Sequence, residues 1–115
     1  MKYVLLINLG PRGRDFKNLP PDEQKSIAAG YKAINETPGV TPSGVQLQPP
    51  ETATTVRVED GKTLTTDGPF VETKEALDGW CIYEADDLDA AIDLASGIPA
   101  ASMGGAIEVR PVAEW

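Results

Sequence analysis

KYVLLINL, which spans Lys2–Leu9, is apolar at nearly every position and decides the fold. A second run of this kind, GWCIYEA, spans Gly79–Ala85 and has large side chains on both of its faces. One face has Trp80 and Ile82, and the other has Cys81 and Tyr83. Unbroken apolar runs of this length are typical of strands that are covered on both sides. We therefore predict two central strands in a sheet, with material packed on each face.

Two helices are predicted, one between these strands and one after the second strand. PPDEQKSIAAGYKAIN, residues 20–35, has proline at its start, acidic residues in its first turn and a single apolar face. That face consists of Ile27, Tyr31 and Ile34. A second helix begins at Asp86 or Asp87, ends at Gly97 and Pro99, and should bury one side. The expected buried side consists of Leu88, Ala91, Ile92 and Ala95. Residues 10–20 are expected to form a loop.

Three further strands are predicted. SGVQLQPP, residues 43–50, contains a short strand that is stopped by two prolines. GAIEVRPV, residues 105–112, alternates, with Ile107 and Val109 on one face and Glu108 and Arg110 on the other. TATTVRVEDGKTLTT, residues 52–66, is a hairpin. A two-residue Asp60-Gly61 turn would pair Val56 with Thr65, whereas a three-residue loop would pair Val56 with Leu64. We prefer the second register because it pairs apolar with apolar side chains.

The order of elements is strand, helix, strand, hairpin, strand, helix, strand, which is an α+β, split βαβ plan in one domain over residues 1–115. Two helices can cover only one face of the sheet. Because the central strands are apolar on both faces, we predict that a second copy of the chain covers the other. The expected homodimer interface is on the order of 2,000 Å² in total.

Composition excludes several classes of function. The chain has 10 Lys and Arg against 18 Asp and Glu, a net charge of −8, which argues against nucleic-acid binding. It has no histidine, and the clustered aspartates near residue 87 fit a helix start without a metal ion. The single cysteine, Cys81, is expected to be a buried, inert thiol. There is no membrane span, and the start of the chain is expected to be a strand, not a signal peptide. We expect a cytoplasmic protein.

The stretch TTDGPFVETKEALDGW, residues 65–80, places aromatic and ionisable residues around one turn. In one interpretation Asp67 accepts hydrogen bonds within its turn, Gly68 has a positive φ or approaches another backbone closely, and Phe70 packs into the core. In the other, Asp67 lies at the mouth of a pocket with aromatic walls. The expected ligand-binding residues are Asp67, Phe70, Glu72, Lys74, Trp80 and Arg110, with Asp67 and Lys74 the candidates for catalysis.

For two groups of charged residues, two interpretations stay open. Glu72, Lys74 and Glu75 form either a solvated, mutually paired loop or a site in which Lys74 holds an anionic ligand. Glu108 and Arg110 share a strand face. They are buried or contact ligand if that face lines a barrel, and they are simply solvated if the strand is an edge.

This stretch resembles the DGPF-motif group of the YCII-related proteins, and the likeness extends from KYVLLI to EVRPV. The resemblance implies a ferredoxin-like α+β fold that pairs into a dimeric α+β barrel. It also implies a bacterial protein, often encoded beside extracytoplasmic-function sigma factors. Some members of the wider family have a His–Asp pair proposed as catalytic, which this histidine-free chain lacks. Relatives commonly have Gly-Gly-Tyr where this chain has Asp78-Gly79-Trp80.

Two functions fit these observations. The first is a homodimer that binds a small acidic or lactone-like ligand, or regulates a sigma-factor system, without chemistry. The second is a small-molecule enzyme that needs no cofactor and uses carboxylate and lysine acid–base chemistry. The lack of a nucleophile–base pair favours the first.

Overall fold

The computed structural model describes residues 1–41, 45–69 and 76–114 of the 115-residue chain. In chain order its elements are β1 (Lys2–Leu9), α1 (Pro11–Arg14), the 3₁₀ turn η1 (Phe16–Asn18), α2 (Pro21–Asn35), β2 (Val45–Gln46), the 3₁₀ turn η2 (Pro50–Thr52), β3 (Thr54–Glu59), β4 (Lys62–Asp67), β5 (Ala76–Glu84), α3 (Leu88–Ser96), α4 (Pro99–Ser102) and β6 (Ala106–Pro111).

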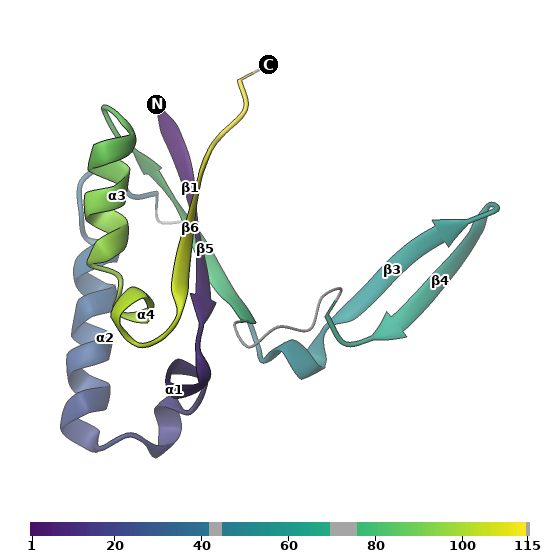
Figure 1. The fold of residues 1–115 in the computed structure, drawn as a ribbon, viewed down its shortest axis with the longest axis horizontal. Helices are drawn as coiled ribbons and strands as arrows, with labels where there is room; N and C mark the ends of the chain where they lie inside the picture. Colours follow the sequence, from purple (N-terminus) through teal and green to yellow (C-terminus); the bar gives the residue numbers. More distant parts are fainter. Residues whose placement is uncertain (42–44, 70–75, 115) are drawn as a thin grey trace.

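Within the described ranges, six strands form two antiparallel sheets. The larger sheet has the order β2-β5-β1-β6, and the smaller sheet of these ranges consists of β3 and β4. The α+β class is confirmed, and β1 and β5 occupy the two central positions that the sequence predicts. Helices α2, α3 and α4 lie on one side of the larger sheet, and the β3–β4 hairpin projects on the other side (Figure 1).

The core lies between the sheet and these helices. Leu5 of β1 is fully buried, flanked by Cys81 and Val109 on the neighbouring strands, and it packs in one cluster with Ile98 and Ala91 from the helix layer. Cys81 is 3 % exposed, as expected for a structural thiol. Burial raises the pKa of the Cys81 thiol, so little reactive thiolate forms near neutral pH.

The buried side of α3 differs from the prediction. Asp87 is the N-cap, and its side chain accepts a hydrogen bond from the Ala90 amide, as expected for an aspartate before the first turn. Ala91 and Ala95 are buried. Leu88 and Ile92, however, are each 48 % exposed, so their predicted burial is wrong. The helix turns its alanines to the sheet because small side chains allow closer packing, and this rotates the larger pair toward solvent.

Two short helices were not predicted. Residues 10–20 contain α1 and η1 where a loop was expected, and α4 follows directly after α3. Pro11 and Pro99 each begin a four-residue helix. Proline is favoured at a first helical position, but a single turn is too short to show an apolar periodicity. The sequence pattern therefore indicates only the chain breaks at these prolines.

The hairpin register also corrects the prediction. Val56 lies opposite Thr65 and Glu59 lies opposite Lys62, so the turn has two residues and the predicted three-residue loop is wrong. Asp60 and Gly61 have φ values of 50° and 74°, as a two-residue type I′ turn requires. Val56 is 60 % exposed. Because the hairpin has no buried face in the single chain, the turn preference outweighs apolar pairing.

The base of the hairpin is closed at Gly68, whose φ of 98° confirms the predicted positive value. The Gly68 amide donates to the Ala53 carbonyl at 2.7 Å, and the Gly68 carbonyl accepts from the Thr55 hydroxyl at 2.8 Å. A Cβ at this position would meet nothing within 4 Å. The requirement for glycine is therefore conformational, not steric crowding.

We predict that Gly68→Ala lowers the free energy of unfolding by about 1–2 kcal/mol, because alanine is strained at this φ. Urea denaturation of the wild type and the variant measures the difference. Gly97→Ala is the matched control, since Gly97 has a φ of −87° and should tolerate alanine with little change. Equal midpoints for wild type and Gly68→Ala would show that the turn places no such demand.

Candidate functional site

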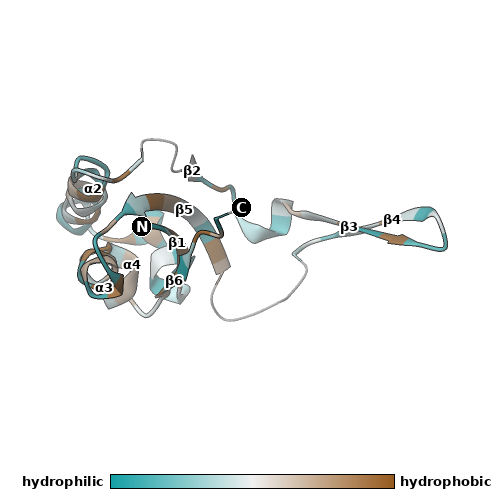
Figure 2. Cartoon of the chain, turned by 90° about the horizontal axis from the view of Figure 1, so that it is seen from above, coloured by the Kyte–Doolittle hydropathy of each residue, from teal (hydrophilic) through white to brown (hydrophobic). Residues whose placement is uncertain are grey.

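The face of the larger sheet opposite α2, α3 and α4, termed the open face, has a band of apolar side chains. Residues directly opposite each other in an antiparallel pair share a face. Leu6 lies opposite Trp80 on one side and Glu108 on the other, and Val4 lies opposite Ile82 and Arg110. The apolar members are Val4, Leu6, Leu77, Trp80 and Ile82. Figure 2 shows from above how the helices, the sheet and the hairpin are arranged, with the helices on one side of the sheet and the hairpin on the other.

Glu108 and Arg110 provide the charge on this face. Both side chains are exposed and β6 is an edge strand, so the pair is solvated in the single chain, and lining a barrel would require a second copy of the chain. Neither forms an ion pair among the residues that the structure describes, although they are two residues apart on one strand. A guanidinium without an acidic partner is suited to carboxylate or phosphate groups, which it can bind with two parallel hydrogen bonds.

Trp80 lies across β1 from this pair. It is half-buried in the single chain, and its backbone pairs with Val45 at the other edge of the sheet. With β1 between them, the backbones of β5 and β6 are about 10 Å apart. Val4 and Leu6 on β1 thus form an apolar surface between the Trp80 indole and the Arg110 guanidinium.

Asp67 occupies a different element. It is the last residue of β4, lies opposite Thr54 and is exposed. Within the described ranges, no hydrogen bond or ion pair joins Asp67 to Trp80 or Arg110. The structure thus brings Trp80 and Arg110 onto one face, with Asp67 at the base of the hairpin. Phe70, Glu72, Lys74 and Glu75 lie outside the described residues.

Sequence reasoning missed a polar cluster behind the open face. Asp78 is the extra residue where the β1–β5 register shifts, which is the arrangement of a β-bulge. Burial raises the pKa of Asp78, and a hydrogen bond from the Gln46 side chain opposes this shift. Burial and the Asp78 charge raise the pKa of Tyr31 on α2, and a hydrogen bond with the Ala100 backbone partly opposes this rise. A lone aspartate inside an apolar strand run was the available signal.

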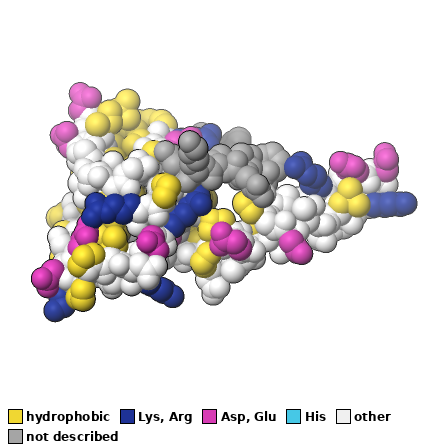
Figure 3. All heavy atoms as spheres, turned by 60° about the horizontal axis from the view of Figure 1, so that its bottom comes forward, with side chains coloured by type: hydrophobic (Ala, Val, Ile, Leu, Met, Phe, Trp, Pro, Cys, Tyr) yellow, Lys and Arg dark blue, Asp and Glu magenta, His cyan; other side chains and the backbone are white. Residues whose placement is uncertain are grey.

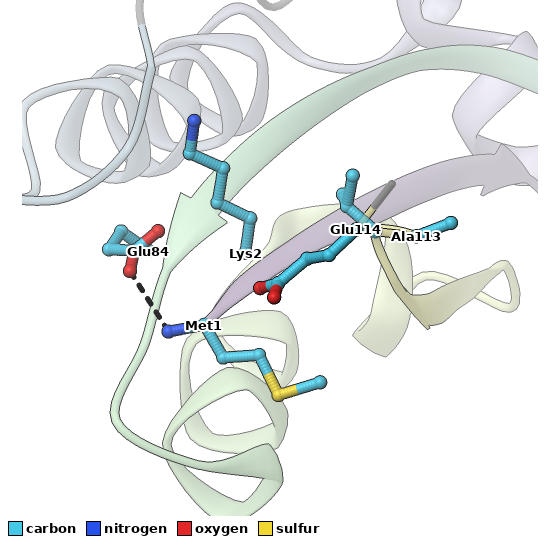
Figure 4. A pocket seen from close by; sticks show the side chains of 6 residues that line it. Met1, Lys2, Glu84, Ala113 and Glu114 are labelled. Carbon is cyan, nitrogen blue, oxygen red and sulfur yellow. Dashed lines mark hydrogen bonds and ion pairs between the residues drawn. The ribbon is translucent and has the colours of Figure 1, made fainter.

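A hollow of about 350 Å³ lies at one end of the sheet (Figure 4). The Met1 amino nitrogen is 2.9 Å from a Glu84 carboxylate oxygen there, and both side chains are about half exposed. An exposed pair of this kind contributes about 1 kcal/mol or less. None of the described site residues, Asp67, Trp80 and Arg110, lines the hollow. Its lining consists of Met1, Lys2, Glu84, Val112, Ala113 and Glu114.

On the face of the molecule that Figure 3 shows, acidic and basic side chains are interspersed over the body and at the tip of the hairpin. Over the described ranges, no group of three or more His, Cys, Asp or Glu side chains is placed to hold a metal ion. No described helix combines the length and apolar character needed to cross a membrane.

Together these features define an α+β protein with a four-stranded antiparallel sheet, helices on one face, and a second face with an apolar band flanked by charged residues. The chain belongs to the YCII-related family, since the family model of the YCII-related domain matches residues 1–115. It is also 42 % identical over 69 residues to an uncharacterized protein of Rhizobium meliloti (strain 1021). That match covers 59 % of this chain and 56 % of the relative, so the chain aligns with little more than half of that protein.

We predict that Asp78→Asn raises the free energy of unfolding at pH 7. A carboxyl with a raised pKa in the folded state is costly to ionise there, so its charge destabilises the fold above its ordinary pKa of 3.8. Asparagine keeps an oxygen for the Gln46 hydrogen bond and removes the charge. The gain should vanish near pH 3, where Asp78 is protonated in both states.

Thermal melts at pH 7 and about pH 3 measure this difference. Asp93→Asn on the exposed side of α3 is the matched control, and it should show no comparable gain. An Asp78→Asn variant that is less stable than wild type at pH 7 would contradict the assigned cost of ionisation.

Proposed function

We propose that this protein is a homodimer that binds a small acidic or lactone-like ligand between the open faces of two copies. The observation that carries the proposal is the apolar second face of β1 and β5, which α2, α3 and α4 leave uncovered. Stacking two such faces would form the dimeric α+β barrel that the ferredoxin-like, split βαβ plan suggests. The resemblance to the DGPF-motif group supports the same pairing.

The ligand class follows from the chemistry of the open face. Arg110 would bind a carboxylate or a lactone carbonyl, while Val4, Leu6 and Trp80 contact the apolar part of the molecule. Asp67 and the segment 70–75, with Phe70, Glu72 and Lys74, are proposed as the rim on sequence grounds. The chain has no histidine, and the described part of the open face has no nucleophile beside a base. We therefore favour binding over catalysis.

We also propose that the ligand-binding dimer regulates a sigma-factor system. It rests on the resemblance of residues 65–80 to the DGPF-motif group. Ligand-dependent regulation requires a site for a small molecule, and the proposed site on the open face would supply it.

We predict that wild-type protein sediments as a dimer at micromolar concentration and that Leu6→Glu shifts it to monomer. The substitution places a charge in the middle of the stacked apolar faces, where desolvation is costly. Leu88→Glu on α3 is the matched control, because Leu88 is 48 % exposed on the helix side of the molecule. A wild-type monomer would contradict the proposal, as would a Leu6→Glu variant that stays dimeric.

We predict that benzoate, phenylacetate or γ-butyrolactone raises the melting temperature of the wild type and that Arg110→Gln abolishes the shift. The glutamine variant cannot make the charge-assisted hydrogen bonds of a guanidinium. Lys25→Gln, which removes one positive charge from the exposed side of α2, should leave the shift intact. A shift that survives Arg110→Gln would remove Arg110 from the site.

A further inference from the structure

In the part of the chain that the structure describes, β3 and β4 pair with no other strand, and the hairpin forms an arm. It forms a separate two-stranded sheet, and it extends away from the rest of the chain (Figure 1). The radius of gyration is 15.9 Å, compared with about 13 Å for a compact domain of this length. A lone two-stranded hairpin is marginally stable in water. The arm is therefore expected to pack against something that a single chain does not provide.

One side of this arm, termed the valine face, is a surface of β-branched residues. Val56 lies opposite Thr65, and Val58 lies opposite Thr63, so these four side chains share one face. Val56 and Val58 are 60 % and 67 % exposed, which is more than any other large apolar side chain that the structure describes. The other side of the arm has Glu59 opposite Lys62, Arg57 opposite Leu64 and Thr55 opposite Thr66, so it has three charged side chains and a single exposed leucine. The valine face is thus the side suited to burial.

The direction of the arm indicates its partner. It projects on the same side as the open face and away from the helices, in both of the views in which this side is seen (Figures 1 and 2). A sheet stacked on the open face would lie about 10 Å away, and a six-residue strand extends about 20 Å. An arm of this length passes the stacked sheet and reaches its far side.

Charge also fits a second copy of the chain. The open face has Lys2 and Arg110 with Glu84 and Glu108, so its charges balance although the net charge of the chain is −8. The tip of the arm also has both signs, at Glu59, Asp60 and Lys62. Two copies can therefore approach through these surfaces without a patch of like charge.

We propose that the valine face of each arm packs against the flank of a second copy of the chain, so that two arms clasp the dimer around its two-fold axis. This inference rests on the homodimer of the proposed function and adds a second contact surface to it. In a two-fold dimer each arm makes the same contact, so every substitution acts twice.

The test compares dimer dissociation constants by sedimentation equilibrium. Val56→Thr combined with Val58→Thr keeps the β-branched shape and introduces hydroxyl groups on the valine face. The expected result is a dimer weakened roughly tenfold or more, because apolar side chains are removed from both arms. Leu64→Thr, on the opposite side of the same arm, is the matched control and should weaken the dimer by less than about threefold.

Hydrogen exchange of wild-type protein supplies a readout that does not depend on a variant folding. Backbone amides of β3 and β4 should exchange more slowly at concentrations where the dimer forms than at concentrations where it dissociates. If the wild type is a dimer and the variant with Val56→Thr and Val58→Thr has the same dimer dissociation constant, the arm contact is overturned and the stacked sheets remain. Arm exchange that is independent of concentration would also overturn it, while a wild-type monomer at all concentrations would overturn both proposals.

Discussion

The structure depends on two central strands that are apolar on both faces, combined with helices that cover only one. Strands β1 and β5 satisfy their backbone hydrogen bonds within the sheet, so the unmet requirement is the burial of side chains such as Leu6 and Trp80. Val4, Leu6, Trp80 and Ile82 are only partly buried in the single chain, and apolar surface that is left partly in water is costly and is typical of an interface. The placement of Arg110 on the edge strand and the direction of the β3–β4 arm have a common explanation if a second copy covers this face.

Much of the fold could be predicted because its long elements have strong patterns. The bounds of β1, the central position of β5 and the apolar side of α2 follow from periodicity alone. The hairpin register did not, because Val56 and Leu64 are both exposed and the backbone preference of Asp60-Gly61 therefore decides. The buried side of α3 was misassigned for a related reason, since periodicity does not distinguish a stripe of alanines from the adjacent stripe that contains Leu88.

The candidate site could be predicted only in part. Strict alternation along β5 and β6 places Trp80 and Arg110, because side chains two residues apart share a face. Asp67 is close to Trp80 in sequence but belongs to the arm, since Gly68 closes the hairpin directly after it. Asp78 was missed because a bulge breaks the alternation that would have placed it. A sequence pattern assumes regular strands, and it fails where an extra residue is inserted.

Trp80 gives the most direct test that a second copy covers the open face. The chain has two tryptophans, so Trp115→Phe leaves Trp80 as the single reporter. Acrylamide quenching of its fluorescence should be weak at concentrations where the protein sediments as a dimer, and should increase on dilution as monomer appears. Strong quenching of Trp80 at every concentration, including those at which a dimer is present, would show that the open face remains in water and would contradict the account.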